Sequence, residues 1–228
     1  MGMNALTHIY DWVFDLDNTL YPRTCDLFAQ IDMLITDYVM NVTALPFDQA
    51  RKLQKDYYRD HGTTLNGLMN YHGVDPDHYL SKVHAIDYSP VDPHPELVTA
   101  IQNLPGRKFI FTNADIPHTK AVLAKLGASD LFDGMFDIRD AEFRPKPEQH
   151  AYDLFLKRFG IDPARAVMFD DLHKNLKVPH EIGMSTVQVV ADPDFVHHQV
   201  DAWELSRVDD QPHVHHVTSD IASFLNTG

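Results

Sequence analysis

The chain has 228 residues, of which 44% are hydrophobic, and its 33 Asp and Glu against 19 Lys and Arg give a formal charge of −14. This length suffices for one substantial core and a smaller second one, since domains typically hold about 100 to 200 residues. The negative charge repels a nucleic-acid backbone and no basic run offsets it, so we expect no nucleic-acid polymer as a partner. Because no apolar run approaches the roughly 20 residues that span a bilayer, we expect no membrane partner either.

The cysteine content and the first twenty residues bear on where the protein works. The single cysteine, Cys25, has no partner for an internal disulfide. The beginning of the chain carries Asp11, Asp15 and Asp17 where a signal peptide would need an uninterrupted apolar stretch. We therefore expect a cytoplasmic protein, and the sequence leaves its oligomeric state open between a monomer and a homodimer.

A strand opens the predicted fold. Residues 9–14 are rich in aromatic and β-branched side chains and stop at a polar cluster, residues 15–19. Apolar residues then recur at helical spacing over residues 25–87, with three glycines as breaks, which predicts an insert of about four helices. The proline-rich residues 89–95 predict the return to the main domain, because proline blocks helix continuation.

Strands and helices alternate in the rest of the chain. The pattern predicts strands at residues 108–112, 134–137, 166–169, 186–190 and 213–217. It predicts helices at residues 115–127, 147–160, 173–182 and 219–225. Such alternation indicates a parallel sheet covered on both faces. We therefore predict an α/β fold: a doubly wound, Rossmann-like core of residues 1–21 and 89–228, with a helical cap domain, residues 22–88, inserted after the first strand.

One residue interrupts the predicted helix over residues 173–182. Pro179 has no backbone N–H group, so it removes one hydrogen bond from the helix. We expect the helix to bend at this position without a loss of function.

Polar residues follow the predicted strands at the edge where open parallel sheets bind ligands. They are Asp15 to Thr19, Thr112 with Asn113, Lys146, and Asp170 with Asp171. We expect the topology to bring four carboxylates together, those of Asp15, Asp17, Asp170 and Asp171. Two like charges about 4 Å apart repel by roughly 4 kcal/mol at an effective dielectric constant of about 20, so this cluster requires a cation. Hard oxygen ligands without Cys or His favour Mg²⁺.

Thr112 and Lys146 add a hydroxyl donor and a fixed positive charge. Such groups hold phosphate oxygens, whose own charge repels an attacking carboxylate. Purely structural roles are the alternative, because Asp170 and Asp171 could cap the following helix, and Asp15 and Asp17 are common in solvated turns. Taken together, the residues favour phosphoryl transfer on a small phosphorylated metabolite.

These motifs, in this order between Tyr10 and Val190, resemble the haloacid dehalogenase-like superfamily of phosphatases. The resemblance implies that Asp15 is the nucleophile that forms an aspartyl-phosphate. It implies that Asp17 is the general acid for the leaving oxygen and then the general base for water. Thr112 and Lys146 would orient the phosphoryl group. The implied magnesium ligands are the Asp15 carboxylate, the Asp17 backbone carbonyl, Asp171, and Asp170 either directly or through water.

Three stretches are similar, more narrowly, to the pyrimidine 5′-nucleotidase branch of this superfamily. They are FDLDNTLYP at residues 14–22, HGTTLNGL at residues 61–68 and FDDLHKNL at residues 169–176. This similarity implies a pyrimidine nucleoside 5′-monophosphate as the substrate. Contacts to the phosphate or to the rest of the substrate are predicted for Leu16, Asn18, Asn113, Tyr21 and Asn66.

Other functions stay open at the level of the sequence. A sugar-phosphate or phosphoglycolate phosphatase, or a phosphomutase, would share every catalytic residue, because the cap selects the substrate beyond its phosphate. A non-enzymatic signalling module also accepts phosphate on Asp, but it lacks a large helical insert and a second Asp two residues on. Asp17 argues against a true dehalogenase, whose chemistry needs neither a metal nor a protonated leaving group. The absence of Lys directly after Asp15 argues against a cation-pump ATPase.

Overall fold

The computed structural model describes residues 6–191 and 211–226. The chain divides into two compact units, one formed by the residues up to Cys25 and from Val91 onward, the other by Asp26–Pro90. Each unit is described by itself below. No helix in the described residues is long and apolar enough to cross a membrane.

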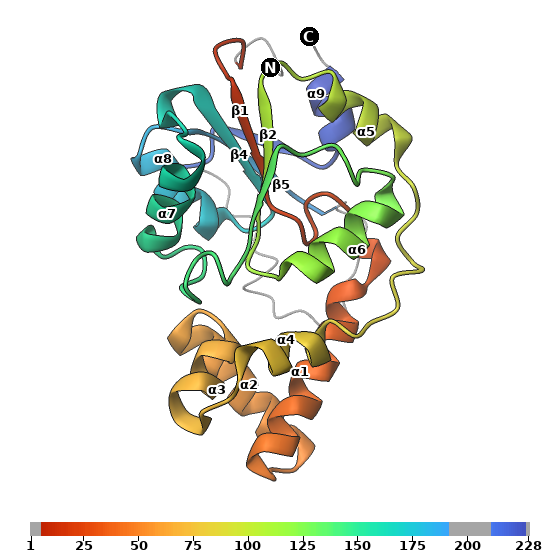
Figure 1. Ribbon diagram of the computed structural model, residues 1–228, viewed down its shortest axis with the longest axis vertical. Helices are drawn as coiled ribbons and strands as arrows, with labels where there is room; N and C mark the ends of the chain where they lie inside the picture. Colours follow the sequence, from red (N-terminus) through yellow and green to blue (C-terminus); the bar gives the residue numbers. More distant parts are fainter. Residues whose placement is uncertain (1–5, 192–210, 227–228) are drawn as a thin grey trace. The chain divides into compact units, whose positions relative to one another are not determined.

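A six-stranded parallel sheet forms the centre of the larger unit, with the strand order β3-β2-β1-β4-β5-β6 (Figure 1). Every neighbouring pair is parallel. The strands are β1 (Asp11–Phe14), β2 (Arg107–Phe111), β3 (Gly134–Phe136), β4 (Ala166–Asp170), β5 (Ser185–Val189) and β6 (His216–Thr218). Two series of strands run outward from β1 and β4, so the predicted doubly wound, Rossmann-like fold is confirmed.

Helices cover both faces of this sheet. Figure 1 shows α7 and α8 on one face and α5, α6 and α9 on the other. The helices are α5 (Pro95–Gln102), α6 (Ile116–Leu126), α7 (Gln149–Phe159), α8 (Lys177–Glu181) and α9 (Ile221–Asn226). Short 3₁₀ turns are η2 (Arg23–Cys25), η3 (Pro163–Arg165) and η4 (His173–Leu176). The helix α5 follows the proline-rich linker and was not predicted from the sequence.

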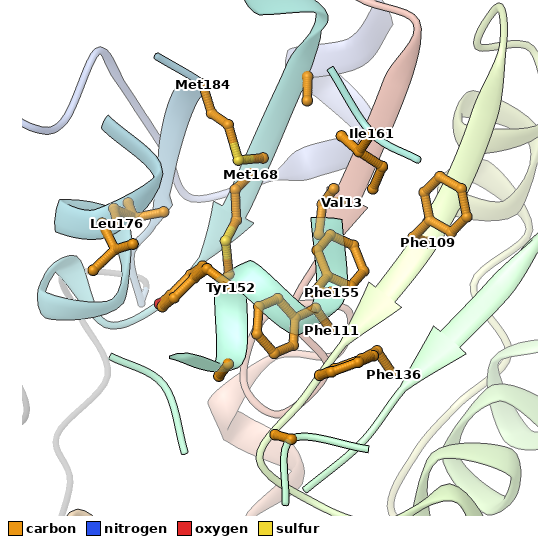
Figure 2. Close-up of a cluster of buried hydrophobic side chains, with 14 residues drawn as sticks. Val13, Phe109, Phe111, Phe136, Tyr152, Phe155, Ile161, Met168, Leu176 and Met184 are labelled. Atoms are coloured by element: carbon orange, nitrogen blue, oxygen red, sulfur yellow. The ribbon is translucent and has the colours of Figure 1, made fainter. Parts of the chain in front are cut away.

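Aromatic side chains fill the space between α7 and the sheet (Figure 2). The ring of Phe155 stacks on Phe111, with centroids 4.7 Å apart and planes 16° apart. Tyr152 and Phe136 meet Phe111 edge to face, with centroids 5.2 Å away in both cases. Aromatic pairs in these geometries add about 0.5 to 1.5 kcal/mol each beyond the burial of apolar area. This face of α7 is therefore part of the hydrophobic core beneath the sheet.

The helix expected over residues 173–182 is divided in the structure. The 3₁₀ turn η4 ends at Leu176 and α8 occupies Lys177–Glu181. Pro179 cannot donate to the Asn175 carbonyl one turn earlier, and the Tyr152 hydroxyl donates to that carbonyl instead, at 2.7 Å. The buried carbonyl thus keeps a partner despite the proline.

Several other predicted boundaries were wrong by two or three residues, and two of them are instructive. The helix expected from residue 147 begins at Gln149, after the cis peptide bond between Lys146 and Pro147. Pro147 therefore belongs to the preceding loop and not to the first helical turn. The strand expected at residues 213–217 is β6, which begins only at His216.

The smaller unit consists of four helices, α1 (Leu27–Thr43), α2 (Phe47–His61), α3 (Thr64–His72) and α4 (Pro76–Val83). Two of them begin at side-chain caps: Thr63 accepts from the Asn66 amide, and Asp75 accepts from the His78 amide. Gly73 ends α3 in the left-handed conformation that glycine adopts without strain. Residues 22–25 belong to the larger unit, whereas residues 89 and 90 belong to this one.

A buried carboxylate holds α1 to α2 within this unit. Asp32 on α1 is 4% exposed. Its side chain pairs with Arg51 at 2.7 Å and with Lys55 at 3.0 Å, and accepts from the Gln54 side chain at 2.7 Å. A buried charge is tolerated when it is paired and hydrogen-bonded in this way.

Asp32→Asn is expected to destabilise the protein by about 2 to 3 kcal/mol, because removing one partner of a buried ion pair leaves the other charges uncompensated. Urea denaturation measures the free energy of unfolding. Asp37→Asn, on the exposed side of the same helix, is the matched control and should change that energy by less than about 0.5 kcal/mol. Equal effects of the two substitutions would show that the network around Asp32 does not stabilise the unit.

Candidate active site

The loop that follows β1 places Asp15 at the carboxyl edge of the sheet. The Asp15 amide donates to the Phe169 carbonyl at 2.9 Å, which continues the β1–β4 ladder by one residue. The Leu16 carbonyl accepts from the Leu20 amide at 3.0 Å, and Asn18 has a φ of 59°, so the chain turns back at once. Asn tolerates this left-handed conformation better than most residues. The Thr19 hydroxyl donates to Asp15 Oδ2 at 3.0 Å and fixes the carboxylate.

A buried ammonium group lies against Asp15. Lys146 Nζ donates to Asp15 Oδ1 at 2.8 Å, to Asp170 Oδ2 at 2.7 Å and to the Phe111 carbonyl at 2.8 Å. The Lys146 side chain is 1% exposed. Burial alone would lower the pKa of Lys146, but the charges of Asp15 and Asp170 raise it well above its usual value. The side chain is therefore a permanent cation beside Asp15.

Asn113 fixes the backbone of this lysine. Its Oδ1 atom accepts from the Lys146 amide at 2.8 Å, and its Nδ2 group donates to the Lys146 carbonyl at 3.1 Å. The preceding residue, Thr112, is 1% exposed, and its Oγ1 atom accepts from the Ala114 amide at 3.0 Å. The hydroxyl of Thr112 thus has an acceptor role within the loop, and its proton can be directed to a ligand.

Three carboxylates, which we call the acidic group, meet at this edge of the sheet. Asp15, Asp170 and Asp171 each offer an oxygen that lies within 4.8 Å of the other two. Oxygens about 2.1 Å from a Mg²⁺ ion stand about 4 Å apart when they are opposite each other, so this spacing fits one ion. The donors are hard oxygens, which match Mg²⁺.

The raised pKa values of Asp15 and Asp171 also indicate that a cation binds here. Burial raises the pKa of Asp15 to about 7, with Asp170 and Asp17 adding to the rise and Lys146 opposing it. Burial, Asp170 and Asp15 likewise raise the pKa of Asp171 well above its usual range, against the influence of Arg23. The ionised forms are thus destabilised, and a divalent cation would offset this.

The two acidic residues after β4 differ in their partners. Asp170 is fully buried, and its Oδ1 atom accepts from the Leu172 amide and from Asn175 Nδ2, both at 2.9 Å. Asp171 pairs with Arg23 Nη2 at 2.5 Å, and the two side chains are 7% and 9% exposed. Asp170 is thus held by the protein on both oxygens, since Lys146 bonds the second one.

The fourth predicted carboxylate, that of Asp17, has different neighbours. Its Oδ1 atom accepts from the Tyr21 hydroxyl at 2.6 Å and lies 2.7 Å from His118 Nε2. The Asp17 side chain therefore stands outside the group of three carboxylates with metal-ligand spacing, although its charge still helps to raise the pKa of Asp15. Although burial alone would lower the pKa of His118, Asp17 and Asp115 raise it.

His118 is a residue that the sequence interpretation missed. It lies on the first turn of α6, is 1% exposed, and comes 101 residues after Asp17. The sequence did contain a signal for it. A histidine in the first turn of the helix that follows Thr112 and Asn113 lies at the edge of the sheet where ligands bind. Nothing in the local sequence indicated which acid it would meet.

The remaining predicted contact residues are distributed as follows. Leu16 is fully buried, and Tyr21 is 1% exposed with its hydroxyl on Asp17. Asn18 contributes its turn conformation. Asn66 belongs to the four-helix unit, where its side chain donates to the His61 carbonyl at 3.1 Å. Substrate contacts by these residues stay predictions.

A family model described as haloacid dehalogenase-like hydrolase matches residues 13–183. This match covers most of the chain. The chain belongs to the haloacid dehalogenase-like hydrolases.

This hydrolase is similar to proteins of several kinds. It is 25% identical over 191 residues to Phosphate metabolism protein 8 of Saccharomyces cerevisiae. The matched region covers 76% of this chain and 59% of the yeast protein. The chain therefore spans about 59% of the length of that curated relative.

Two solved structures illustrate the similarity of fold. The HAD-hydrolase YfnB from Bacillus subtilis bound to magnesium superposes with a TM-score of 0.57 at 15% identity, over 96% of this hydrolase and 99% of that chain. The defluorinating L-2-haloacid dehalogenase Rha0230 gives a TM-score of 0.57 at 16% identity, over 95% and 94% of the two chains. At these identities the similarity concerns the fold alone.

Mg²⁺ is expected to raise the melting temperature of this hydrolase, and to raise it more at pH 8 than at pH 5.5. The pKa of Asp15 in the folded protein, about 7, exceeds the ordinary aspartate value of 3.8. The metal-free folded state therefore holds more protons than the unfolded state between these values, and loses stability as the pH rises through this window. An ion at 100 times its dissociation constant adds about 2.7 kcal/mol, or roughly 5 to 10 °C for a protein of this size.

Differential scanning fluorimetry in EDTA and in Mg²⁺ measures this shift. Asp171→Asn should lose most of it, whereas Asp153→Asn, at an exposed position of α7, should keep it. A shift of the same size in wild type and Asp171→Asn would place the ion elsewhere.

Proposed function

We propose that the protein is a Mg²⁺-dependent phosphomonoester hydrolase that works through an aspartyl-phosphate on Asp15. The observation that carries this proposal is the contact of the buried Lys146 ammonium with Asp15 Oδ1 inside the acidic group. A carboxylate next to a permanent cation and a divalent ion can approach an anionic phosphate, because the positive charges offset the repulsion between the two anions.

The first half of the reaction forms the covalent intermediate. A carboxylate oxygen of Asp15 attacks phosphorus as the bond from phosphorus to the leaving oxygen breaks. Asp17, in its protonated form, gives its proton to that oxygen, which leaves as an alcohol. The charge of Lys146, whose three protons already bond protein oxygens, would attract the transferring phosphoryl group, and the Thr112 hydroxyl would donate to one of its oxygens.

The second half restores the enzyme. Asp17, now ionised, takes a proton from water as the water oxygen attacks phosphorus. The bond between phosphorus and Asp15 breaks, inorganic phosphate leaves, and the Asp15 carboxylate is free again. Asp17 ends protonated and is ready for another substrate molecule.

Asp15, Asp171, the Asp17 backbone carbonyl and Asp170 are the residues that would hold the magnesium ion, with Asp170 bound directly or through water. When bound, the ion supplies positive charge that orients the phosphate and stabilises its developing charge. The residues fit this role because their oxygens are hard, buried and close together.

We propose a pyrimidine nucleoside 5′-monophosphate as the substrate. Support comes from the three stretches at residues 14–22, 61–68 and 169–176, which are similar to pyrimidine 5′-nucleotidases, and from the helical insert at the position of a cap. The name of the yeast relative also connects it with phosphate metabolism. Sugar phosphates, phosphoglycolate and a phosphomutase reaction are the alternatives within the same chemistry.

The dehalogenase chemistry of several fold neighbours is the competing function. Fold similarity at 15 to 16% identity does not choose between the two reactions. The residues of this chain favour the phosphatase, because dehalogenation has no use for an acid at position 17 or for a three-carboxylate group. We further propose that the protein works in the cytoplasm, where its free cysteine, Cys25, stays reduced.

A substrate panel tests the proposed function. Phosphate release is measured with Mg²⁺ for pyrimidine and purine nucleoside monophosphates, sugar phosphates and phosphoglycolate, and halide release for an L-2-haloacid. Phosphate release without halide release is expected, with a pyrimidine nucleotide as the best substrate. Halide release alone would refute the phosphatase assignment.

Asp15→Asn is expected to lower phosphate release by at least about 10³-fold, because the amide cannot form the acyl phosphate. Circular dichroism should show an intact fold. The control Asp153→Asn should keep wild-type turnover. Turnover of Asp15→Asn near the wild-type rate would refute the nucleophile assignment.

A further inference from the structure

The strongest unexplained contact outside the acidic group joins the first turn of α6 to the loop after β1. His118 Nε2 lies 2.7 Å from Asp17 Oδ1. The His118 side chain is fully buried, whereas the Asp17 side chain is 20% exposed. Burying an imidazole costs free energy unless it is hydrogen-bonded, and Asp17 supplies a partner, so the position of the Asp17 carboxylate is tied to a side chain inside the protein.

The scaffold fixes this histidine from several directions. Asp115 caps α6 by accepting from the His118 amide at 3.0 Å. The Thr119 hydroxyl donates to the Asp115 carbonyl at 3.0 Å, and the Ile116 amide donates to Asp137 Oδ2 at 3.1 Å. The first turn of α6 is therefore anchored to its N-cap and to the loop after β3. His118 is a rigid element against which Asp17 is held.

Tyr21 completes the arrangement from the other side. Its hydroxyl donates to the same oxygen, Asp17 Oδ1, at 2.6 Å, and its side chain is buried. Two buried groups from different elements thus meet one carboxylate oxygen. Two directional bonds to one atom restrict both torsion angles of a short side chain, so they select one orientation of the Asp17 carboxylate.

We propose that His118 is a positioning residue that, together with Tyr21, holds the Asp17 carboxylate in the orientation needed for acid and base catalysis. This inference rests on the proposed function, because it assigns His118 a role only through Asp17. Neither side chain touches the phosphate in this scheme. Loss of the positioning residue should slow the two proton transfers and leave the attack by Asp15 intact.

The test compares p-nitrophenyl phosphate with phenyl phosphate, which share a phenyl ring and differ in how much their leaving group needs a proton. His118→Ala should lower kcat/KM for phenyl phosphate about 10- to 100-fold and lower it much less for p-nitrophenyl phosphate. In stopped-flow experiments with p-nitrophenyl phosphate, this variant should release a burst approaching one p-nitrophenol per enzyme. The burst arises because hydrolysis of the aspartyl-phosphate needs Asp17 as a base.

Variants with graded changes separate positioning from packing. His118→Gln, which carries a donor near the place of Nε2, should recover most of the lost rate, and His118→Leu, which keeps volume without a donor, should behave like His118→Ala. His118→Leu also replaces His118→Ala if the smaller side chain prevents folding. Lys120→Ala, at an exposed position of α6, should match the wild type.

Asp17→Asn is the reference variant that separates the positioning role of His118 from the proposed phosphatase chemistry. A burst with Asp17→Asn and wild-type behaviour of His118→Leu and His118→Ala would overturn the positioning role and leave the phosphatase intact. A uniform loss on both phenyl substrates, without a burst and without recovery in His118→Gln, would also overturn it. Asp17→Asn with unchanged turnover would overturn both the inference and the proposed chemistry.

Discussion

The bridge from Lys146 to Asp15 and Asp170 is the interaction on which the site depends. It joins the loop before α7 to the ends of β1 and β4, and its third bond reaches the end of β2 at the Phe111 carbonyl. A buried ammonium group is stable only when its protons are matched by oxygens, and here three oxygens from three strands supply them. The same contacts therefore close the carboxyl edge of the sheet and set the charge beside Asp15.

Much of the fold was predictable from the sequence because its signals are local. Short apolar runs that alternate with helical periodicity predicted every strand of the parallel sheet. The helices predicted to end at residues 127 and 160 end at glycine caps in these positions. Boundaries failed where tertiary contacts decide them. Pro147 follows a cis bond and stays in a loop, and the short sheet-edge strand β6 begins later than its apolar pattern suggested.

In the candidate site, too, the features that follow from local signals and sheet topology were predicted, and those that depend on distant contacts were not. Asp15, Asp170 and Asp171 were predicted to meet because the carboxyl ends of parallel strands share one edge, and the structure places them together. One partner of Asp17 was beyond prediction, because His118 lies 101 residues further along the chain and no local signal connects the two. The bonds from the Asn113 side chain to the Lys146 backbone were also beyond prediction, because they depend on the path of a distant loop. Its contact with the phosphate stays a prediction.

The bond from the Tyr152 hydroxyl to the Asn175 carbonyl carries a consequence for how this sequence can change. Asn175 also donates to Asp170, so the tyrosine supports the acidic edge from within the aromatic core. With proline at 179, the carbonyl relies on Tyr152; with a residue that carries an N–H at 179, the helix could supply its own donor and the phenol would become dispensable. Positions 152 and 179 are therefore expected to vary together among homologous sequences, phenylalanine being tolerated at 152 where 179 is not proline.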